Sequence, residues 1–458
     1  MASDPILTNL QRVDPNIKSY ETTKHIIQSS AEGFIVKTKT SSEERRHLFV
    51  KYVEPKKYSH KVWADLRRTI HYTRTEVRFY NEILPTLKNN VNDDWPICPK
   101  VYLADYNVQG LMDENESTEA KEVAESDESS ASPDPQYDAN DTSVLEGKYG
   151  VLVLDNATEV NKCFQIAPLC LNLALKSVEA LAKFHATAFQ KEDILTKVSE
   201  RLCRYGGSYH LKNRNPKEMQ HLVEAWEGFV RDIGPEAPSG FFDDVKMQTL
   251  GKRVFDAAEY ISQELSPLPN EPFATIVHGD YKAMNIFFRG ENEEEGVDLA
   301  PTHINMSPLL IDFASSGVGL GASDLAMHVA HVALPEDLDN GMEDILVEKY
   351  FSVLQDALPD NVKNTYSREE ARRHYLFGTV DYFRFILGRQ WKGATTEVFA
   401  KRNKDTNFAM VNRSIDAALH FSKRVDLYLR DIEEEMSSAN GKRWNNLTRQ
   451  SRASSNHT

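Results

Sequence analysis

The chain of 458 residues is too long for one ordinary hydrophobic core and suits two or three lobes, and its 40% hydrophobic and 27% charged content is typical of a soluble globular protein. The net charge of −15 is concentrated in two stretches: positions 111–148 hold twelve acidic residues and two lysines, positions 291–300 hold five acidic residues and no base, and the remainder holds 52 of each sign. The sequence therefore lacks the basic surface of a nucleic-acid-binding protein, and no run of about 20 apolar residues predicts a membrane-spanning helix.

The first residues and the cysteines bear on localisation. Met1–Pro5 contains neither a basic region nor an apolar run, so no signal peptide is predicted. The four cysteines, Cys98, Cys163, Cys170 and Cys203, form no Cys-x-x-Cys pair, and we expect reduced thiols, not a disulfide framework or a zinc site. These features predict a cytoplasmic protein.

Strands dominate the prediction for the first third of the chain. Apolar or alternating runs of strand length occupy Phe34–Thr38, Leu48–Val53, Pro99–Tyr106 and Tyr149–Leu154. One helix interrupts these strands, since apolar residues recur at helical spacing from Trp63 to Leu84, and Pro85 is expected to end it.

Three polar segments are predicted to be disordered. The segment from about 112 to 146 is rich in Glu, Asp, Ser and Pro and nearly lacks aromatic residues, so it cannot bury enough apolar surface to offset its ordering entropy. It lies between two predicted strands and is interpreted as an insertion between neighbours in a sheet. The segment from about 290 to 305 is similar, and the tail from 437 to 458 is also polar.

Helices dominate the prediction after Leu154. The predicted helices lie within Leu169–Gln190, Pro216–Val230, Phe242–Leu265, Met342–Asp356, Glu369–Ile386 and Ala409–Glu434. The sequence thus predicts an α+β protein with an N-terminal lobe over residues 1–154, a mainly helical C-terminal lobe over 155–436, and a disordered tail over 437–458.

The segment from Ile276 to Phe288 carries the strongest indication of chemistry. An apolar strand leads into His278-Gly279-Asp280, Asn285 follows five residues after Asp280, and a second apolar strand comes next. Phosphoryl transfer from ATP needs a carboxylate to orient the attacking hydroxyl and accept its proton, and oxygen ligands for Mg²⁺ near the phosphates. One short loop that presents Asp280 and Asn285 can supply both. The alternative is a turn between strands that contains Asp and Asn by chance.

A second carboxylate follows an apolar strand further along the chain. Pro308–Ile311 leads directly into Asp312, and a buried carboxylate there would be costly without a cation. The alternative is an ordinary strand-terminal Asp. Asp324 lies twelve residues on, where the alternative interpretation is a simple helix N-cap.

A lysine and a glutamate upstream form a third candidate pair. Lys51 lies inside the apolar strand Leu48–Val53, where lysine is normally excluded, and Glu76 follows 25 residues later on the predicted helix. A lysine that contacts the α- and β-phosphates and is positioned by a helical glutamate explains both residues. The alternatives are an edge-strand lysine and a solvated glutamate.

Nucleotide-binding features outside these pairs are weaker. The strand ending at Leu154, followed by Asp155 and Asn156, could present main-chain groups to an adenine edge, or could be a plain buried strand and turn. Ser29–Gly33 stands where a glycine-rich phosphate loop is expected, before Lys51, but it has one glycine.

These residues resemble the ecdysteroid-kinase-like and choline-kinase-like (CHK) proteins, which are relatives of the aminoglycoside phosphotransferases. The resemblance spans about residues 31–427 without the acidic insertions, and its specific motifs are His278–Asp280 with Asn285, and Ile311–Phe313 with Asp324–Ala326. Leu181–Ala186 is also similar to the helix that precedes the catalytic region of that family. The resemblance implies a two-lobed protein-kinase-like fold: a small antiparallel-sheet N-lobe with one helix, and a large helical C-lobe.

The resemblance also implies a role for each motif residue. By this resemblance Asp280 is the catalytic base, Asn285 and Asp312 hold Mg²⁺, Lys51 and Glu76 bind ATP, Leu154, Asp155 and Asn156 form the hinge, and His278 and Asp324 support the catalytic loop. The sequence departs from the pattern in its glycine-poor phosphate loop, in Ala314 after Asp312-Phe313, which argues against a flipping switch, and in the 32-residue gap between Asp280 and Asp312. Lys282 could contact the γ-phosphate, or could be a solvated loop residue.

We therefore expect an enzyme that transfers the γ-phosphate of Mg·ATP to a hydroxyl of a small molecule, with no nucleic-acid or membrane partner. A protein kinase is disfavoured, because Gly279 stands where arginine is usual and no Ala-Pro-Glu follows Asp312. The alternative from another class is a catalytically weak pseudokinase or nucleotide-binding module, which only the glycine-poor loop favours.

The substrate is not determined by the sequence. Aromatic residues in Tyr375–Trp391 could line a pocket for an apolar ring system such as a steroid, or could be plain core, which is the more common role. Asp381 and Asp339 could bind a cation such as choline, although surface acids are common.

Overall fold

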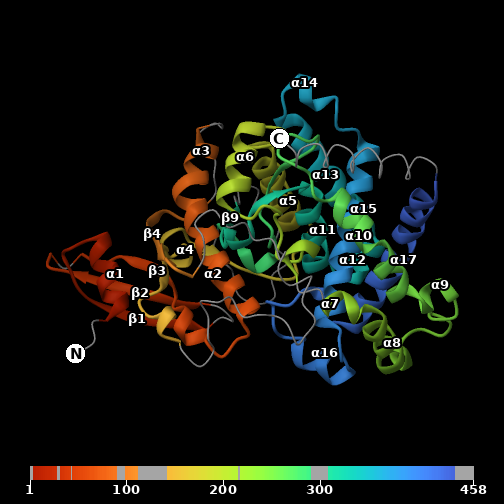
Figure 1. Cartoon of the computed structure of the whole chain (residues 1–458), viewed down its shortest axis with the longest axis horizontal. Helices are drawn as coiled ribbons and strands as arrows, with labels where there is room; N and C mark the ends of the chain where they lie inside the picture. Colours follow the sequence, from red (N-terminus) through yellow and green to blue (C-terminus); the bar gives the residue numbers. More distant parts are fainter. Residues whose placement is uncertain are drawn as a thin grey trace.

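The computed structural model describes residues 4–27, 31–42, 44–89, 98–111, 142–214, 217–289 and 308–438. A part rich in strands lies at one end of the long axis, and helices make up the rest (Figure 1). This arrangement confirms the predicted α+β class with a small sheet-containing lobe and a large helical lobe. The boundary at residue 154 stays a prediction.

A five-stranded antiparallel sheet forms the small lobe. Its strands are β1 (Ile17–Ile27), β2 (Glu32–Thr40), β3 (His47–Val53), β4 (Val101–Asn107) and β5 (Tyr149–Asp155), in the spatial order β1-β2-β3-β5-β4. The predicted strands correspond to β2, β3, β4 and β5. β3 lies between β2 and β5, so the alternative of an edge-strand lysine at Lys51 is wrong.

Two N-terminal elements, β1 and α1 (Pro5–Val13), were not predicted from the sequence. Most of β1 is exposed, so it lacks the apolar alternation that identifies a strand. α1 begins at Asp4, whose carboxylate accepts the N–H of Ile6 at 2.9 Å, and it packs Ile6 and Leu10 against the sheet.

The helix after β3 continues past the proline that was expected to end it. α2 (Trp63–Arg78) passes into a π-turn, η2 (Phe79–Ile83), and then into α3 (Leu84–Lys88). The π-turn directs the N–H of Leu84 to the carbonyl of Phe79, five residues back. Pro85 then occupies the first turn of α3, where its missing N–H costs little, and the helical path runs on.

β4 and β5 pair directly, which confirms that the acidic segment is inserted between neighbouring strands. Most of that segment, residues 112–141, and the predicted disorder at 290–305 and after 438 lie outside the described residues. The predicted boundary at 146 is wrong, because Thr142–Leu145 form a 3₁₀ turn, η3, with Leu145 fully buried beside Leu66 and Ile70. Val144 of the same turn packs against this cluster as well.

The large lobe is built mainly from helices. The longer ones are α5 (Leu171–Ala186), α6 (Glu192–Arg201), α8 (Leu222–Ile233), α10 (Leu250–Glu264), α11 (Gly321–Val332), α13 (Met342–Ala357), α15 (Arg368–Phe385) and α17 (Ile415–Ser437). The shorter ones are α4 (Ala157–Val160), α7 (Lys217–Gln220), α9 (Val245–Gln248), α12 (Pro335–Asp339), α14 (Asp360–Lys363) and α16 (Thr396–Arg402).

Some predicted helix bounds in this lobe need correction. The helix predicted over Phe242–Leu265 is divided at Thr249 into α9 and α10, and the one predicted from Pro216 is divided into α7 and α8. The last helix begins at Ile415 and not at Ala409, because the Ser414 hydroxyl caps the N–H of Ala417 and a 3₁₀ turn precedes it.

Two small sheets in the large lobe carry the segments with the motif residues. One pairs β7 (Thr275–Val277) with β10 (Gly317–Gly319), and the other joins β6 (Cys163–Phe164), β8 (Ile286–Arg289) and β9 (Pro308–Leu310). The loop after β7 contains Asp280, and the loop after β9 contains Asp312. Both loops therefore start from buried strands.

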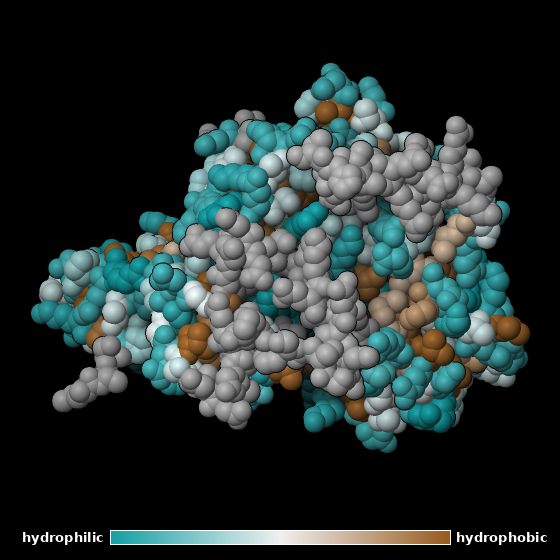
Figure 2. All heavy atoms as spheres, in the orientation of Figure 1, coloured by the Kyte–Doolittle hydropathy of each residue, from teal (hydrophilic) through white to brown (hydrophobic). Residues whose placement is uncertain are grey.

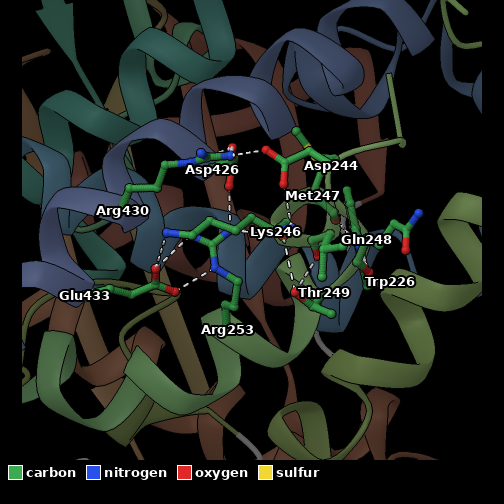
Figure 3. A network of polar contacts seen from close by, with 11 residues as sticks. Trp226, Asp244, Lys246, Met247, Gln248, Thr249, Arg253, Asp426, Arg430 and Glu433 are labelled. Carbon is green, nitrogen blue, oxygen red and sulfur yellow. Dashed lines mark hydrogen bonds and ion pairs between the residues drawn. The ribbon is translucent and has the colours of Figure 1, made fainter. Parts of the chain in front are cut away.

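A polar network joins α9 and α10 to the C-terminal helix α17 (Figure 3). The Arg253 guanidinium donates to Asp426 and, at 2.6 and 3.0 Å, to the two oxygens of Glu433, while Arg430 bridges Asp426 and Asp244 at 2.7 and 2.6 Å. This network fixes the last helix on the lobe.

On the face shown in Figure 2, hydrophilic side chains predominate among the coloured residues, and hydrophobic ones occur in scattered groups. Exposed large apolar side chains, such as Ile27, Val245 and Leu427, come from different elements. Within the described ranges no helix is long and apolar enough to cross a membrane.

Candidate active site

The loop after β7 presents Asp280 from a tight turn. Gly279 has a φ of +82°, and a Cβ there would lie 2.1 Å from the carbonyl oxygen of Ser315, so only glycine fits. The N–H of Lys282 bonds the carbonyl of Asp280 at 2.9 Å and closes the turn. Asp280 thereby stands at the end of a buried strand with its carboxylate only partly exposed.

Asn285 and Lys282 both contact the Asp280 carboxylate. The Asn285 amide donates to the carbonyl of Asp280 at 2.8 Å and to its Oδ2 at 3.1 Å, and Lys282 Nζ contacts the same Oδ2 at 2.8 Å. Burial lowers the pKa of Lys282, but the charges of Asp280 and Asp312 outweigh that effect and raise it. Lys282 is therefore a charged partner of the two carboxylates, and the alternative of a solvated loop residue is wrong.

Asp312 occupies the left-handed backbone region, with φ 67° and ψ 59°. Aspartate tolerates this conformation better than most residues. Burial raises the pKa of Asp312, but the charges of Lys51 and then Lys282 outweigh burial and bring this pKa down to about 2. The carboxylate is therefore charged. Phe313 anchors the next position, because it stacks on Phe79 of η2 with ring centroids 3.9 Å apart.

Lys51 joins the small lobe to this loop. Its Nζ contacts Glu76 Oε2 at 2.7 Å and Asp312 Oδ1 at 2.8 Å. Glu76 on α2 is 4% exposed, so the alternative of a solvated glutamate is wrong. Burial lowers the pKa of Lys51, but Asp312 and Glu76 together raise it above its ordinary value. The predicted lysine and glutamate are therefore brought together, and with Asp312.

His278 ties the two carboxylate-bearing loops to each other. Its Nδ1 accepts the N–H of Asp280 at 3.3 Å, which leaves the proton on Nε2, and Nε2 donates to the carbonyl of Ile311 at 3.0 Å. Burial lowers the pKa of His278, in keeping with this neutral form. The imidazole thus contacts the main chain of Asp280 and of the residue before Asp312.

Asp324 lies within α11 and binds the main chain of the loop that carries Asp280. Leu320, not Asp324, is the N-cap of α11, so the N-cap alternative is wrong. The Asp324 carboxylate accepts the N–H groups of His278 and Gly279 at 2.6 and 2.9 Å, and His185 Nε2 lies 3.1 Å away. All of these groups are buried.

The predicted hinge has a different hydrogen-bond pattern from the one expected. The N–H of Asp155 donates to Lys100 and that of Asn156 to His47, while the Asn156 side chain caps α4. An adenine edge at Leu154–Asn156 could therefore not use these two N–H groups. Of the expected phosphate loop, Ser29 and Ser30 lie outside the described residues.

The donor atoms fit Mg²⁺. Across the described ranges, Asn285 Oδ1 and Asp312 Oδ2 accept no hydrogen bond, so each predicted ligand has an oxygen available, and Asp280 Oδ1 is likewise unused. Carboxylate and amide oxygens are ligands that Mg²⁺ prefers. The described residues contain no cluster of three or more His, Cys, Asp or Glu side chains placed to hold a metal, and the predicted ligand set has one carboxylate, Asp312, and one amide, Asn285.

Sequence reasoning missed two parts of this site. Residues 203–208 run beside the Asp312 loop and bond Gly279 through Ser208, and the Tyr350 hydroxyl bonds His185 Nδ1 at 2.7 Å. No local pattern identified either part. The adjacent glycines Gly206 and Gly207 are the signal that could have indicated close main-chain packing.

The part of the chain that carries the two carboxylate loops matches a family model. Residues 151–361 match the model of the ecdysteroid kinase-like family, so the resemblance inferred from the motifs is confirmed over a segment that contains Asp280, Asn285, Asp312 and Asp324. Lys51 and Glu76 lie outside the match. No curated protein matches the chain.

Several solved structures are similar at low identity. They include choline kinase LicA from Streptococcus pneumoniae (12% identity, 93% of this chain and 98% of that chain, TM-score 0.39) and a microcompartment-associated aminopropanol kinase (10%, 95% and 98%, 0.43). A third is an ethanolamine kinase from Plasmodium vivax (13%, 92% and 85%, 0.40). At this level the similarity carries no conclusion about activity.

Proposed function

We propose that this protein is an ATP-dependent phosphotransferase that acts on a hydroxyl group of a small molecule. The observation that carries the proposal is the joining of the Asp280 and Asp312 loops through His278, with Lys51 and Lys282 as charged partners of the two carboxylates. The family match over residues 151–361 supports it.

Each residue has a role that follows from its contacts. Asp280, with one oxygen held by Asn285 and Lys282, orients the acceptor hydroxyl and takes its proton through the other oxygen. Asn285 and Asp312 hold Mg²⁺, which when bound neutralises charge on the transferring phosphates. Lys51, positioned by Glu76, contacts the α- and β-phosphates, and Lys282 contacts the γ-phosphate.

The acceptor is a hydroxylated small molecule. The positions of two acidic residues and of the aromatic residues in Tyr375–Trp391 bear on how it could be bound. Asp381 is buried and pairs with Arg384 at 2.7 Å, and Asp339 is exposed beside His420, so neither supports the predicted cation site. Five of the six aromatic residues in Tyr375–Trp391 are buried, which favours the core interpretation of that helix. These residues are Tyr375, Phe377, Tyr382, Phe383 and Trp391.

The test is an unbiased screen for ATP-dependent phosphorylation in metabolite extracts, run beside basal ATP hydrolysis with Mg²⁺. We expect turnover by the wild type and a loss of about 10²–10⁴-fold in Asp280→Asn, with ATP binding retained, because the base is lost while phosphate contacts remain. Near-normal turnover by Asp280→Asn would contradict the proposal, and nucleotide binding without any turnover by the wild type would favour a binding module.

A further inference from the structure

A segment between α6 and α7 runs along both carboxylate-bearing loops. The N–H groups of Cys203, Gly206 and Gly207 donate to the carbonyls of Ser316, Val318 and Ser315 at 3.1, 2.7 and 3.0 Å. The N–H of Ser208 donates to the carbonyl of Gly279 at 2.8 Å, next to Asp280. Residues 203–209, called here the 203–209 segment, therefore join the chain just before Asp280 to the chain just after Asp312.

The main chains approach so closely that glycine is required on each side. A Cβ on Gly206 would lie 2.2 Å from the Val277 side chain and 3.0 Å from the main chain of Gly317, and one on Gly317 would lie 2.2 Å from the carbonyl oxygen of Cys203. One on Gly279 would lie 2.8 Å from the nitrogen of Gly207. Such contacts between main chains leave little freedom for one loop to move without the other two.

Two side chains from outside the 203–209 segment, and one of its own, fasten it. The Asn213 amide donates to the carbonyls of Tyr205 and Gly207 at 2.8 and 3.0 Å. Arg384 of α15 donates to the carbonyl of Tyr209 at 2.6 Å, and the Tyr209 hydroxyl donates to the carbonyl of Ser323, beside Asp324, at 2.7 Å. The segment is thus held to α11 and α15 as well as to the loops.

We propose that the 203–209 segment sets the spacing between Asp280 and Asp312, and that Asn213 is a positioning residue which acts through it. This inference rests on the proposed function. Phosphoryl transfer depends on placing the acceptor hydroxyl against the bound phosphate, and a displacement of about 1 Å can cost on the order of 10²-fold in rate. His278 links the same two loops from inside, so the segment is a second link that no sequence motif revealed.

The experiment compares two isosteric substitutions. Asn213→Asp replaces the donating amide with a carboxylate that repels the carbonyls of Tyr205 and Gly207. Gln355→Glu is the matched control, since the Gln355 amide also donates to two main-chain carbonyls, of Lys363 and Tyr366, at 3.2 and 3.0 Å. Both side chains are half-buried. Basal hydrolysis of Mg·ATP and hydrogen exchange are measured on the full chain.

For Asn213→Asp we expect kcat for hydrolysis to fall about 10- to 100-fold, with the KM for ATP within about threefold of wild type. Gln355→Glu should stay within about twofold in both. Peptides over 276–285 and 313–319 should exchange faster in Asn213→Asp only. Equal kcat values in the two variants, or faster exchange confined to 203–213, would overturn the inference.

A milder variant covers the case in which Asn213→Asp does not fold. Tyr209→Phe removes only the hydroxyl that bonds Ser323, and a fall in kcat of about threefold or more supports the inference, while an unchanged kcat overturns it. Failure of the proposed function is separate: it shows as wild-type turnover in Asp280→Asn, and the exchange measurement then still decides whether the segment fixes the two loops.

Discussion

At the scale of single residues, the charged side chains of the candidate site lie in pairs. Lys51 contacts Glu76 and Asp312, Lys282 contacts Asp280, and the low pKa of Asp312 keeps a negative charge in a buried position. Buried ionised groups are costly unless they are paired or bind a cation. The Lys51–Asp312 pair therefore stays charged in its buried position.

Tyr350 supports Asp324 through His185. The Tyr350 hydroxyl donates to His185 Nδ1, which keeps the proton on Nε2 for the Asp324 carboxylate. Tyr350→Phe should lower turnover about three- to tenfold and stability by about 1 kcal/mol. Turnover is measured by basal hydrolysis and stability by urea unfolding.

Tyr366→Phe is the control, because its equally buried hydroxyl bonds His374 Nδ1 at 3.0 Å, away from Asp324. It should cost similar stability with unchanged turnover. Equal effects on turnover would show that Tyr350 has no special role.

The sequence identified the residues whose type is unusual for their place. A lysine in an apolar strand, an Asp before a five-residue turn to Asn, and an Asp ending a buried strand all depart from what packing alone favours. Tyr350 is not unusual in this way, because tyrosine is common on an amphipathic helix. Its role depends on a contact between α13 and α5, which no local pattern encodes.

At the scale of elements, the network between α10 and α17 should contribute measurable stability (Figure 3). Arg253 is the shared donor to Asp426 and Glu433, and Asp426 is 6% exposed in its side chain. Arg253→Met leaves the Asp426 carboxylate with less compensation, although Arg430 remains, and should destabilise the fold by about 2–4 kcal/mol in urea unfolding.

Arg231→Met provides the comparison, because Arg231 is 72% exposed and, within the described part of the chain, pairs with its neighbour Asp232 alone. It should change stability by less than about 0.5 kcal/mol. Similar losses in the two variants would show that the network does not hold α17.

Element types were predictable where periodicity was strong, and the bounds were not. The π-turn at Phe79–Ile83 depends on one redirected hydrogen bond, which no apolar pattern reveals, so Pro85 indicated a helix end that does not exist. β1 escaped prediction because it is exposed along most of its length. The division at Thr249 likewise depends on main-chain geometry.

At the scale of the whole molecule, buried histidines predict sensitivity to acid. Burial lowers the pKa of both His210 and His328 to about 3, against an ordinary value of about 6.5. Unfolding therefore takes up protons between these values, and stability should fall as pH falls from about 6.5 toward 3, by up to about 1.4 kcal/mol per pH unit for each histidine.

Urea unfolding of the wild type and His210→Gln at pH 7.5, 6 and 5 checks this sign. The variant should lose less stability between pH 7.5 and 5 than the wild type, because one of the proton-accepting groups is gone. An identical decline in the two proteins would contradict the assignment of His210.

The division into a sheet-rich and a helical lobe was predictable, because composition and periodicity change along the chain. The approach of three separate segments at Gly206, Gly279 and Gly317 was not, since it is a property of packing between distant parts. The candidate site was therefore predictable in its charged residues but not in the main chain that holds them.

The most direct test of the central claim is Mg²⁺-dependent thermal stabilisation by ATP in the wild type and Asp312→Ala, with Asp339→Ala as a control at an exposed acid. If Asp312 and Asn285 hold Mg²⁺ beside the phosphates, ATP should raise the melting temperature of the wild type and Asp339→Ala only when Mg²⁺ is present, and should leave Asp312→Ala unchanged. Equal stabilisation of Asp312→Ala and the wild type by Mg·ATP would contradict the account.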